Sequence, residues 1–163
     1  MFDKLRKLIK GDQRPIVRSV THPMIGTLDY SEDDEAWLTD PKTSTYGFGF
    51  YISPESAVDC FDFRPASALV DHAASLASNP SAITQLVKSF LTSQLQSNPS
   101  LAADKDEIQK LQLYRVALMW PERPGDGEIE LRTSLDSNRI WGCAYIDRKP
   151  APHLSLPGRD DIH

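Results

Sequence analysis

The 163-residue sequence has few of the features that mark exported, membrane or metal-binding proteins. Its two cysteines, Cys60 and Cys143, form no CxxC pair, which disfavours a disulfide scaffold and a zinc site. No apolar run approaches the roughly 18 residues that a transmembrane helix needs. The basic residues of the opening segment MFDKLRKLIK are not followed by the apolar stretch and cleavage site of a secretory signal. We therefore expect a cytoplasmic protein with no metal and no cofactor.

The sequence also lacks the short motifs of common catalytic sites. There is no GxSxG, and the glycines of segment 46–52 do not follow the GxGxxG spacing of a phosphate loop. His22 precedes a proline, where a histidine side chain more often bonds a turn than acts as a base. We expect a protein that is not an enzyme. The alternative is an unrecognised, hydrolase-like enzyme with its site between sheet and helices, which would need His22 or His72 beside acidic residues.

What the sequence does contain is a clear order of secondary-structure patterns. Short β-rich or alternating segments come first, amphipathic helical segments follow, and alternating segments return at the end. This order predicts an α+β fold in which an antiparallel sheet carries a central run of three helices on one face. The expected strands cover 16–20, 24–30, 36–38, 46–52, 114–120, 127–135 and 139–147. The expected helices cover 66–77, a segment that begins at about Pro80 with its apolar stripe over 83–95, and 101–112.

The two ends of the chain carry different patterns from its centre. Apolar residues recur every three or four positions within 1–11 and are separated by basic residues, which predicts a short amphipathic N-terminal helix. A helix of this length binds membranes weakly, so we expect it to pack on its own domain, without stable membrane association. We expect one domain over 1–150 and an extended or loose, proline-containing tail over 151–163.

Charge is distributed unevenly along the chain, whose net charge is -5. Residues 19–72 contain ten acidic residues against Lys42 and Arg64, whereas residues 1–18 have an excess of four positive charges. No aromatic residues alternate with the basic residues of the first segment, so a nucleic acid is not the expected partner. An acidic segment of this kind is typical either of a solvated surface or of a protein that captures a basic protein partner.

If the acidic segment binds a partner, its most concentrated part should form the contact surface. A tryptophan follows the acidic turn, and tryptophan is common in the centre of protein interfaces. Two further acids lie on the wet face of the alternating segment 127–135. The predicted contact residues are Asp29, Glu32, Asp33, Asp34, Glu35, Trp37 and Asp40, with Glu128 and Glu130 as a second group.

Several short segments resemble a bacterial family of domains of unknown function. The segment His22–Leu28, HPMIGTL, followed by acids and Trp37, is similar to the family's opening strand, and segment 140–147 is similar to its closing strand. The family carries a D-G-K turn where this chain has Asp147, Arg148 and Lys149. Members occur near polymorphic or type VI secretion toxins, and several are regarded as immunity proteins. The resemblance therefore implies a protein that neutralises a toxin or effector, and the acidic segment indicates that this partner is basic.

Overall fold

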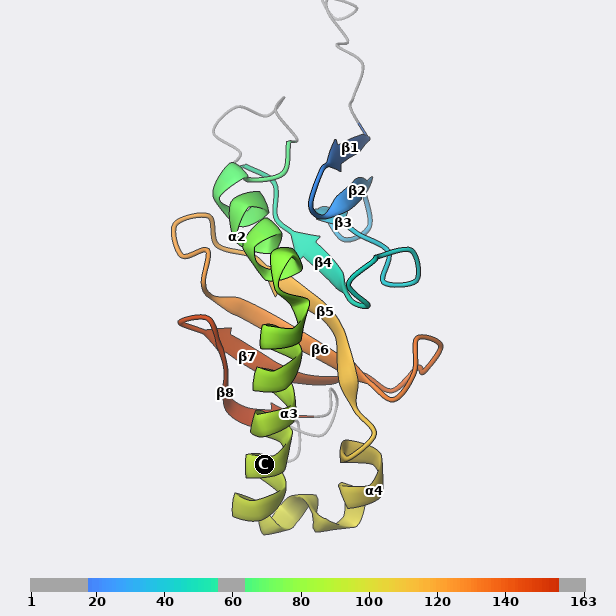
Figure 1. Cartoon of the computed structure of the whole chain (residues 1–163), viewed down its shortest axis with the longest axis vertical. Helices are drawn as coiled ribbons and strands as arrows, with labels where there is room; N and C mark the ends of the chain where they lie inside the picture. Colours follow the sequence, from blue (N-terminus) through green and yellow to red (C-terminus); the bar gives the residue numbers. More distant parts are fainter. Residues whose placement is uncertain (1–17, 56–63, 156–163) are drawn as a thin grey trace, which may run out of the picture.

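The computed structural model describes residues 18–55 and 64–155 (Figure 1). Its centre is one eight-stranded sheet in which every strand lies beside its neighbours in sequence. The strands are β1 (Ser19–His22), β2 (Gly26–Ser31), β3 (Ala36–Leu38), β4 (Gly49–Ile52), β5 (Gln112–Leu118), β6 (Gly127–Arg132), β7 (Trp141–Ile146) and β8 (Lys149–Ser155). With the helices described below, the chain is an α+β protein, as the sequence predicts.

The sheet is mixed and not purely antiparallel. β1 to β4 and β5 to β8 are two antiparallel meanders, and β4 pairs with β5 in parallel. The prediction of an antiparallel sheet was therefore wrong at this central pair. Parallel neighbours require a long crossover, and here the helical segment between β4 and β5 supplies it.

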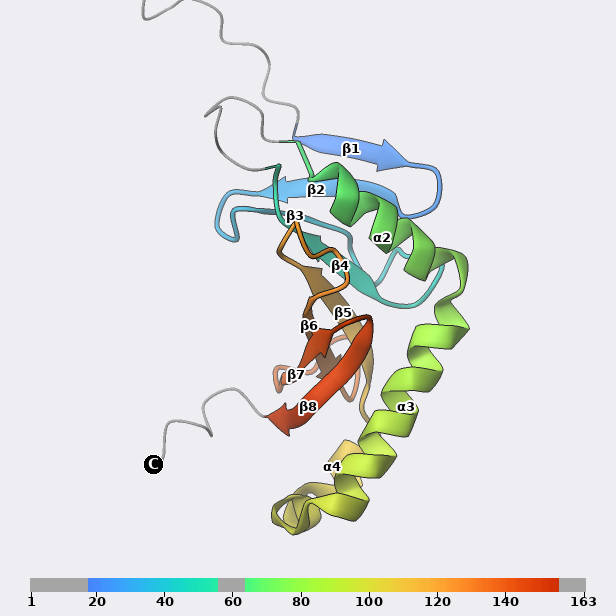
Figure 2. The same cartoon turned by 90° about the vertical axis from the view of Figure 1, so that its left-hand side faces the viewer.

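Two helices run along one face of the sheet, α2 (Ser67–Ser78) and α3 (Pro80–Ser97) (Figure 2). In α3 the buried apolar residues Ile83, Val87 and Leu91 form one stripe that faces the sheet. The third predicted helix is instead a 3₁₀ segment, η1 (Pro99–Asp104), followed by one turn of α-helix, α4 (Lys105–Ile108). Its few buried apolar residues are too widely spaced for a continuous helical stripe, which explains the difference.

The cross-strand register assigns each residue to one face of the sheet. On the face covered by α2 and α3, Trp37, Ile52, Leu118 and Tyr145 lie in one row and are buried. The adjacent row points away from the helices, since successive strand residues face opposite sides. That row contains Asp29, Leu38, Tyr51, Ala117, Glu128 and Ala144. We call the second side of the sheet the helix-free face.

The predicted loose tail is in part a strand. Residues from Lys149 to Ser155 form β8 at the edge of the sheet, where Leu154 is buried and its N–H donates to Gln94 Oε1 at 3.3 Å. The prolines of this segment made a strand look unfavourable, but proline is tolerated in an edge strand, whose outer N–H groups need no partner. The predicted N-terminal helix over 1–11, Cys60 and the chain after Ser155 lie outside the described residues.

The turn between β7 and β8 holds two residues in the left-handed region. Asp147 has φ 50° and Arg148 has φ 65°, the pattern of a tight hairpin turn that favours glycine. Because a left-handed conformation costs a residue with a Cβ about 1–2 kcal/mol, Arg148→Gly should stabilise the fold by about 1 kcal/mol. Thermal unfolding should show a rise in Tm of about 2–4 °C. Asp147→Gly is the matched control with a smaller gain, because aspartate tolerates this conformation; a lower Tm for Arg148→Gly would contradict the expectation.

Candidate protein-binding surface

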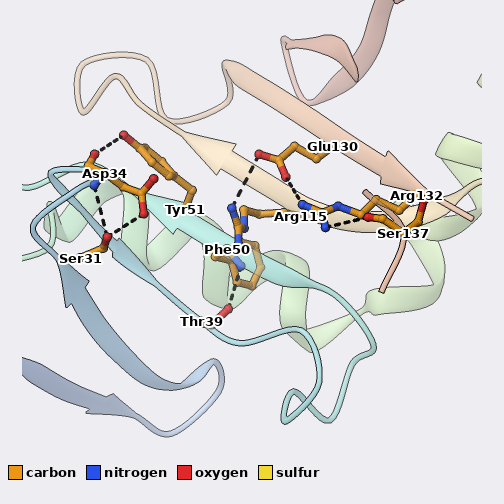
Figure 3. A network of polar contacts seen from close by, with 9 residues as sticks. All are labelled: Ser31, Asp34, Thr39, Phe50, Tyr51, Arg115, Glu130, Arg132 and Ser137. Carbon is orange, nitrogen blue, oxygen red and sulfur yellow. Dashed lines mark hydrogen bonds and ion pairs between the residues drawn. The ribbon is translucent and has the colours of Figure 1, made fainter. Parts of the chain in front are cut away.

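The acidic turn between β2 and β3 is held by its own side chains. Ser31 Oγ donates to Asp34 Oδ2 at 2.6 Å and accepts a hydrogen bond from the Asp34 N–H at 3.2 Å. The hydroxyl of Tyr51, on β4, donates to the backbone oxygen of Asp34 at 3.0 Å (Figure 3). These contacts fix the turn against Tyr51 and so against the helix-free face.

Glu35 lies in this turn in a left-handed conformation, with φ 50°. A glutamate gains nothing from this backbone, and glycine or asparagine would adopt it at lower cost. The carboxylate of Glu35 is exposed and has no hydrogen bond or ion pair among the described residues. Strained residues of this kind concentrate at functional sites. The observation makes Glu35 a candidate contact residue on grounds other than charge.

Carboxylates from two separate parts of the sheet converge at Tyr51. Burial raises the pKa of Tyr51, and the negative charges of Asp34, Glu35 and Glu128 raise it further. Glu128 belongs to β6, two strands away from Tyr51 in the same cross-strand row, which corresponds to roughly 10 Å. The two predicted groups, the turn and the acids of β6, therefore meet through Glu128.

Asp29 extends this negative surface in the other direction. It lies in the same row, two strands from Tyr51 on the opposite side, so the row from Asp29 to Glu128 spans roughly 19 Å. Like Glu35, the exposed carboxylates of Asp29, Asp33 and Glu128 have no hydrogen bond or ion pair within residues 18–55 and 64–155. We define the acidic surface as Asp29, Asp33, Asp34, Glu35 and Glu128.

Two of the predicted acids are separated from this surface or already paired. Glu32 forms an ion pair with Arg18 at 2.8 Å. Asp40 follows β3, whereas Glu35 precedes it, so the two lie at opposite ends of the strand, about 16 Å apart. The Asp40 carboxylate accepts a hydrogen bond from the Lys42 N–H at 2.9 Å and shapes its own turn. Both remain exposed, but neither is a free carboxylate of the acidic surface.

The prediction that Trp37 contacts a partner was wrong. Its side chain is 0% exposed and packs 5.5 Å from the ring of Tyr30, measured between centroids. The cause is the alternation of the strand: Leu38 shares the row of Tyr51 and Glu128, so Trp37 must point to the opposite, helix-covered face. Trp37 is a core residue.

Glu130, also a predicted contact residue, has internal partners. It lies on the same face as Glu128, but its carboxylate is 3.7 Å from Arg115 Nη1 and 4.0 Å from Arg132 Nη2 (Figure 3). Arg132 stacks over the ring of Tyr114 at 3.7 Å and donates to the backbone oxygen of Ser137 at 3.1 Å. Glu130 is neutralised in this half-buried cluster, so it adds little negative charge to the face.

A groove on the helix-free face escaped the sequence analysis. It crosses β6, β7 and β8, has a volume of about 420 Å³, and adjoins the acidic surface because Glu128 belongs to both. We call it the β6–β8 groove. In the sequence, its only signals are Ile146 and the small residues of β7, and they identify a groove only once the neighbouring strands are known. Its lining includes Trp120, Glu128, Gly142, Ala144, Ile146 and His153.

His22 and His72, the two histidines on which the enzyme alternative depends, are each engaged in other contacts. His22 Nδ1 accepts a hydrogen bond from the Met24 N–H at 3.2 Å, which confirms its expected part in a turn. His72, on the buried side of α2, shares a hydrogen bond of 3.1 Å with the hydroxyl of Tyr145. Burial raises the pKa of Tyr145 to about 12 and that of the Cys143 thiol to about 12, so both remain protonated.

The buried His72 predicts a loss of stability in mild acid. Burial lowers the pKa of His72 below its ordinary value of 6.5, and the nearby charge of Arg148 lowers it further. Below pH 6.5, His72 binds a proton in the unfolded chain but remains neutral in the folded chain until the pH reaches its lowered pKa. The free energy of unfolding should therefore decrease as the pH is lowered, by about 1.4 kcal/mol for each pH unit between 6.5 and the pKa of His72 in the folded protein.

His72→Gln should remove this contribution while keeping a polar partner for Tyr145. Urea unfolding at about pH 7.5 and about pH 5 should show a smaller difference for the variant than for the unaltered protein. Equal pH dependence in both proteins would show that His72 is not the group responsible.

Within the described ranges, no three or more histidine, cysteine, aspartate or glutamate side chains are placed to share a metal ion. A helix able to cross a membrane is likewise absent from that part of the chain. No protein family, curated protein or solved structure matches this chain. The site must therefore be interpreted from its own geometry.

Proposed function

We propose that the protein is a cytoplasmic, non-enzymatic binding protein that captures a basic protein through its acidic surface, and that this partner is a toxin or effector which it neutralises. The observation that carries the proposal is geometric: the hydroxyl of Tyr51 holds the acidic turn at Asp34, and Glu128 lies in the cross-strand row of Tyr51, so both groups of carboxylates lie on one face. On the same face, Glu130 offsets one of the two positive charges of Arg115 and Arg132, so the excess of negative charge is confined to the acidic surface.

Electrostatics favours capture over other uses of such a surface. Exposed carboxylates without internal partners attract a cationic protein over distances of about a Debye length, about 8 Å at physiological salt. They repel nucleic acid for the same reason. An inhibitor of a toxin benefits from rapid association, since the toxin acts for as long as it remains free.

The experiment compares capture by the unaltered protein with capture by Asp33→Lys, Glu35→Lys. Both carboxylates are exposed and unpaired, so their reversal leaves the hydrogen bonds of Ser31, Asp34 and Tyr51 in place. Each protein is used as bait in extracts of its native cell, and the captured proteins are identified by mass spectrometry. We expect the unaltered protein to retain a basic protein that the variant loses.

The matched control is Asp71→Lys, Asp106→Lys, which makes the same change in net charge at exposed positions on α2 and α4. It should capture the partner as the unaltered protein does. The captured protein is then expressed alone and together with the unaltered protein. Co-expression should restore growth; capture equally reduced by both variants, or a partner without toxicity, would contradict the proposal.

A further inference from the structure

The β6–β8 groove has a floor that is open to a side chain from outside. Gly142 and Ala144, the floor residues of β7, belong to the helix-free face, in register with Glu130 and Glu128. A Cβ added at Gly142 would meet only Ile129 O, at the ordinary contact distance of 3.6 Å. Ile146 is 49% exposed at one end of this floor. The groove thus presents a short apolar surface in the sheet itself.

Two walls of the groove carry charge and aromatic surface. Trp120 forms one wall, and the guanidinium carbon of Arg123 lies 5.0 Å from its ring centroid, so the chain's own guanidinium already covers part of this ring. Asp126 is occupied, since it pairs with Arg123 at 3.3 Å and accepts a hydrogen bond from the Asp147 N–H at 2.9 Å.

Glu128 is therefore the carboxylate of the groove that lacks a partner among the described residues. Glu128 lies in the same cross-strand row as Tyr51, two strands away, and Asp34 and Glu35 add negative charge at Tyr51 as Glu128 does. Glu128 thus supplies an unpaired negative charge at this side of the groove, whereas the Arg123–Asp126 pair is neutral and the exposed Lys149 lies across from Ile146 at the end of the floor.

We propose that the β6–β8 groove binds an arginine side chain of the protein partner, with the aliphatic stem over Ala144 and Ile146 and the guanidinium beside Glu128. Arginine fits because its stem covers apolar surface while its planar head pairs with a carboxylate and stacks on aromatic rings. This inference rests on the proposed function, and it names the group that the acidic surface attracts.

The test uses the tripeptide acetyl-Leu-Arg-Leu-amide as the probe and its citrulline counterpart as an uncharged match. Titration into the ¹⁵N-labelled protein is followed by NMR. The arginine peptide should shift the indole signal of Trp120 and the amide signals of Ala144 and Ile146, whereas the citrulline peptide should bind at least about three-fold more weakly, as expected for one exposed charge pair.

Two variants alter the groove in different ways. Gly142→Val fills the floor, its Cβ at an ordinary contact distance from Ile129 O, and should abolish the shifts; valine is also well suited to a strand. Glu128→Gln keeps the shape and removes the charge, so it should reduce the preference for arginine over citrulline. Asp71→Asn, on α2, is the matched control and should bind as the unaltered protein does. Equal binding of the two peptides, or shifts that survive both groove variants, would overturn the inference.

The outcomes separate this inference from the proposed function. If the Asp33 and Glu35 reversal abolishes capture but the arginine peptide does not bind in the groove, the groove inference is wrong and the capture function is supported. If the peptide binds specifically in the groove but that reversal leaves capture unaffected, the groove inference is supported and capture through the acidic surface is wrong.

Discussion

Gly127→Ala is expected to destabilise the fold by about 3 kcal/mol, which corresponds to a fall in Tm of about 6–12 °C. Gly127 begins β6, between β5 and β7, and a Cβ at this position would lie 1.9 Å from Ala117 O and 3.0 Å from Ala117 C. Both atoms are backbone in the centre of the sheet, so no side-chain rotation relieves the overlap. The strands must move apart, and hydrogen bonds between β5 and β6 must weaken.

Gly142→Ala is the matched control for this prediction. Gly142 lies in the neighbouring strand β7, where the added methyl group meets ordinary contact distances, and its change in stability should stay within about 0.5 kcal/mol. Thermal and urea unfolding of both variants provide the measurement. A Gly127→Ala variant as stable as Gly142→Ala would mean that β5 and β6 are not held at the separation described above.

The double reversal Asp33→Lys, Glu35→Lys is expected to slow association with the captured partner by about ten-fold or more at low salt. The change of four charge units turns the attraction at the acidic turn into repulsion. It acts mainly on encounter, so the association rate should fall more than the dissociation rate rises. Surface plasmon resonance at several salt concentrations, with the purified partner, measures both rates.

Salt dependence distinguishes steering from the loss of a local contact. The association rate of the unaltered protein should fall as salt rises, while that of the variant should change little or rise, because screening weakens attraction and repulsion alike. The reversal of Asp71 and Asp106 should preserve the steep dependence. Identical salt profiles for the unaltered protein and the Asp33 and Glu35 variant would argue against an electrostatic role for the turn.

Local periodicity allowed much of the fold to be predicted. The alternation in β6 correctly placed Ile129 and Leu131 in the core, where both are 0% exposed. The helical spacing in α3 correctly placed Ile83 and Val87 against the sheet. The same spacing also favoured Leu86, which is 40% exposed, because the sheet covers a narrower stripe of the helix than the apolar pattern suggests.

Long-range pairing could not be predicted from such patterns. Glu128 and Glu130 are equivalent in the sequence, yet Glu130 meets Arg115 across β5 and Glu128 meets Ala117. The difference arises from the register of two strands that no local signal specifies. The same reasoning applies to Trp37. It is close to the acidic turn in sequence, but its side chain lies on the opposite face of the sheet. The β6–β8 groove forms only when three strands pair in register, so local patterns could not predict it.

The parallel contact of β4 with β5 has a consequence for how the chain folds. Each meander is built from hairpins whose connections have at most ten residues, whereas Ile52 and Gln112 are joined through the whole helical crossover. Closing so long a loop costs more chain entropy than closing a hairpin, and it is repaid only when the helices pack. We expect the two meanders to form early and their union to limit the folding rate, so substitutions at Phe50 or Val116, which pair across that seam, should slow refolding more than substitutions within either hairpin array.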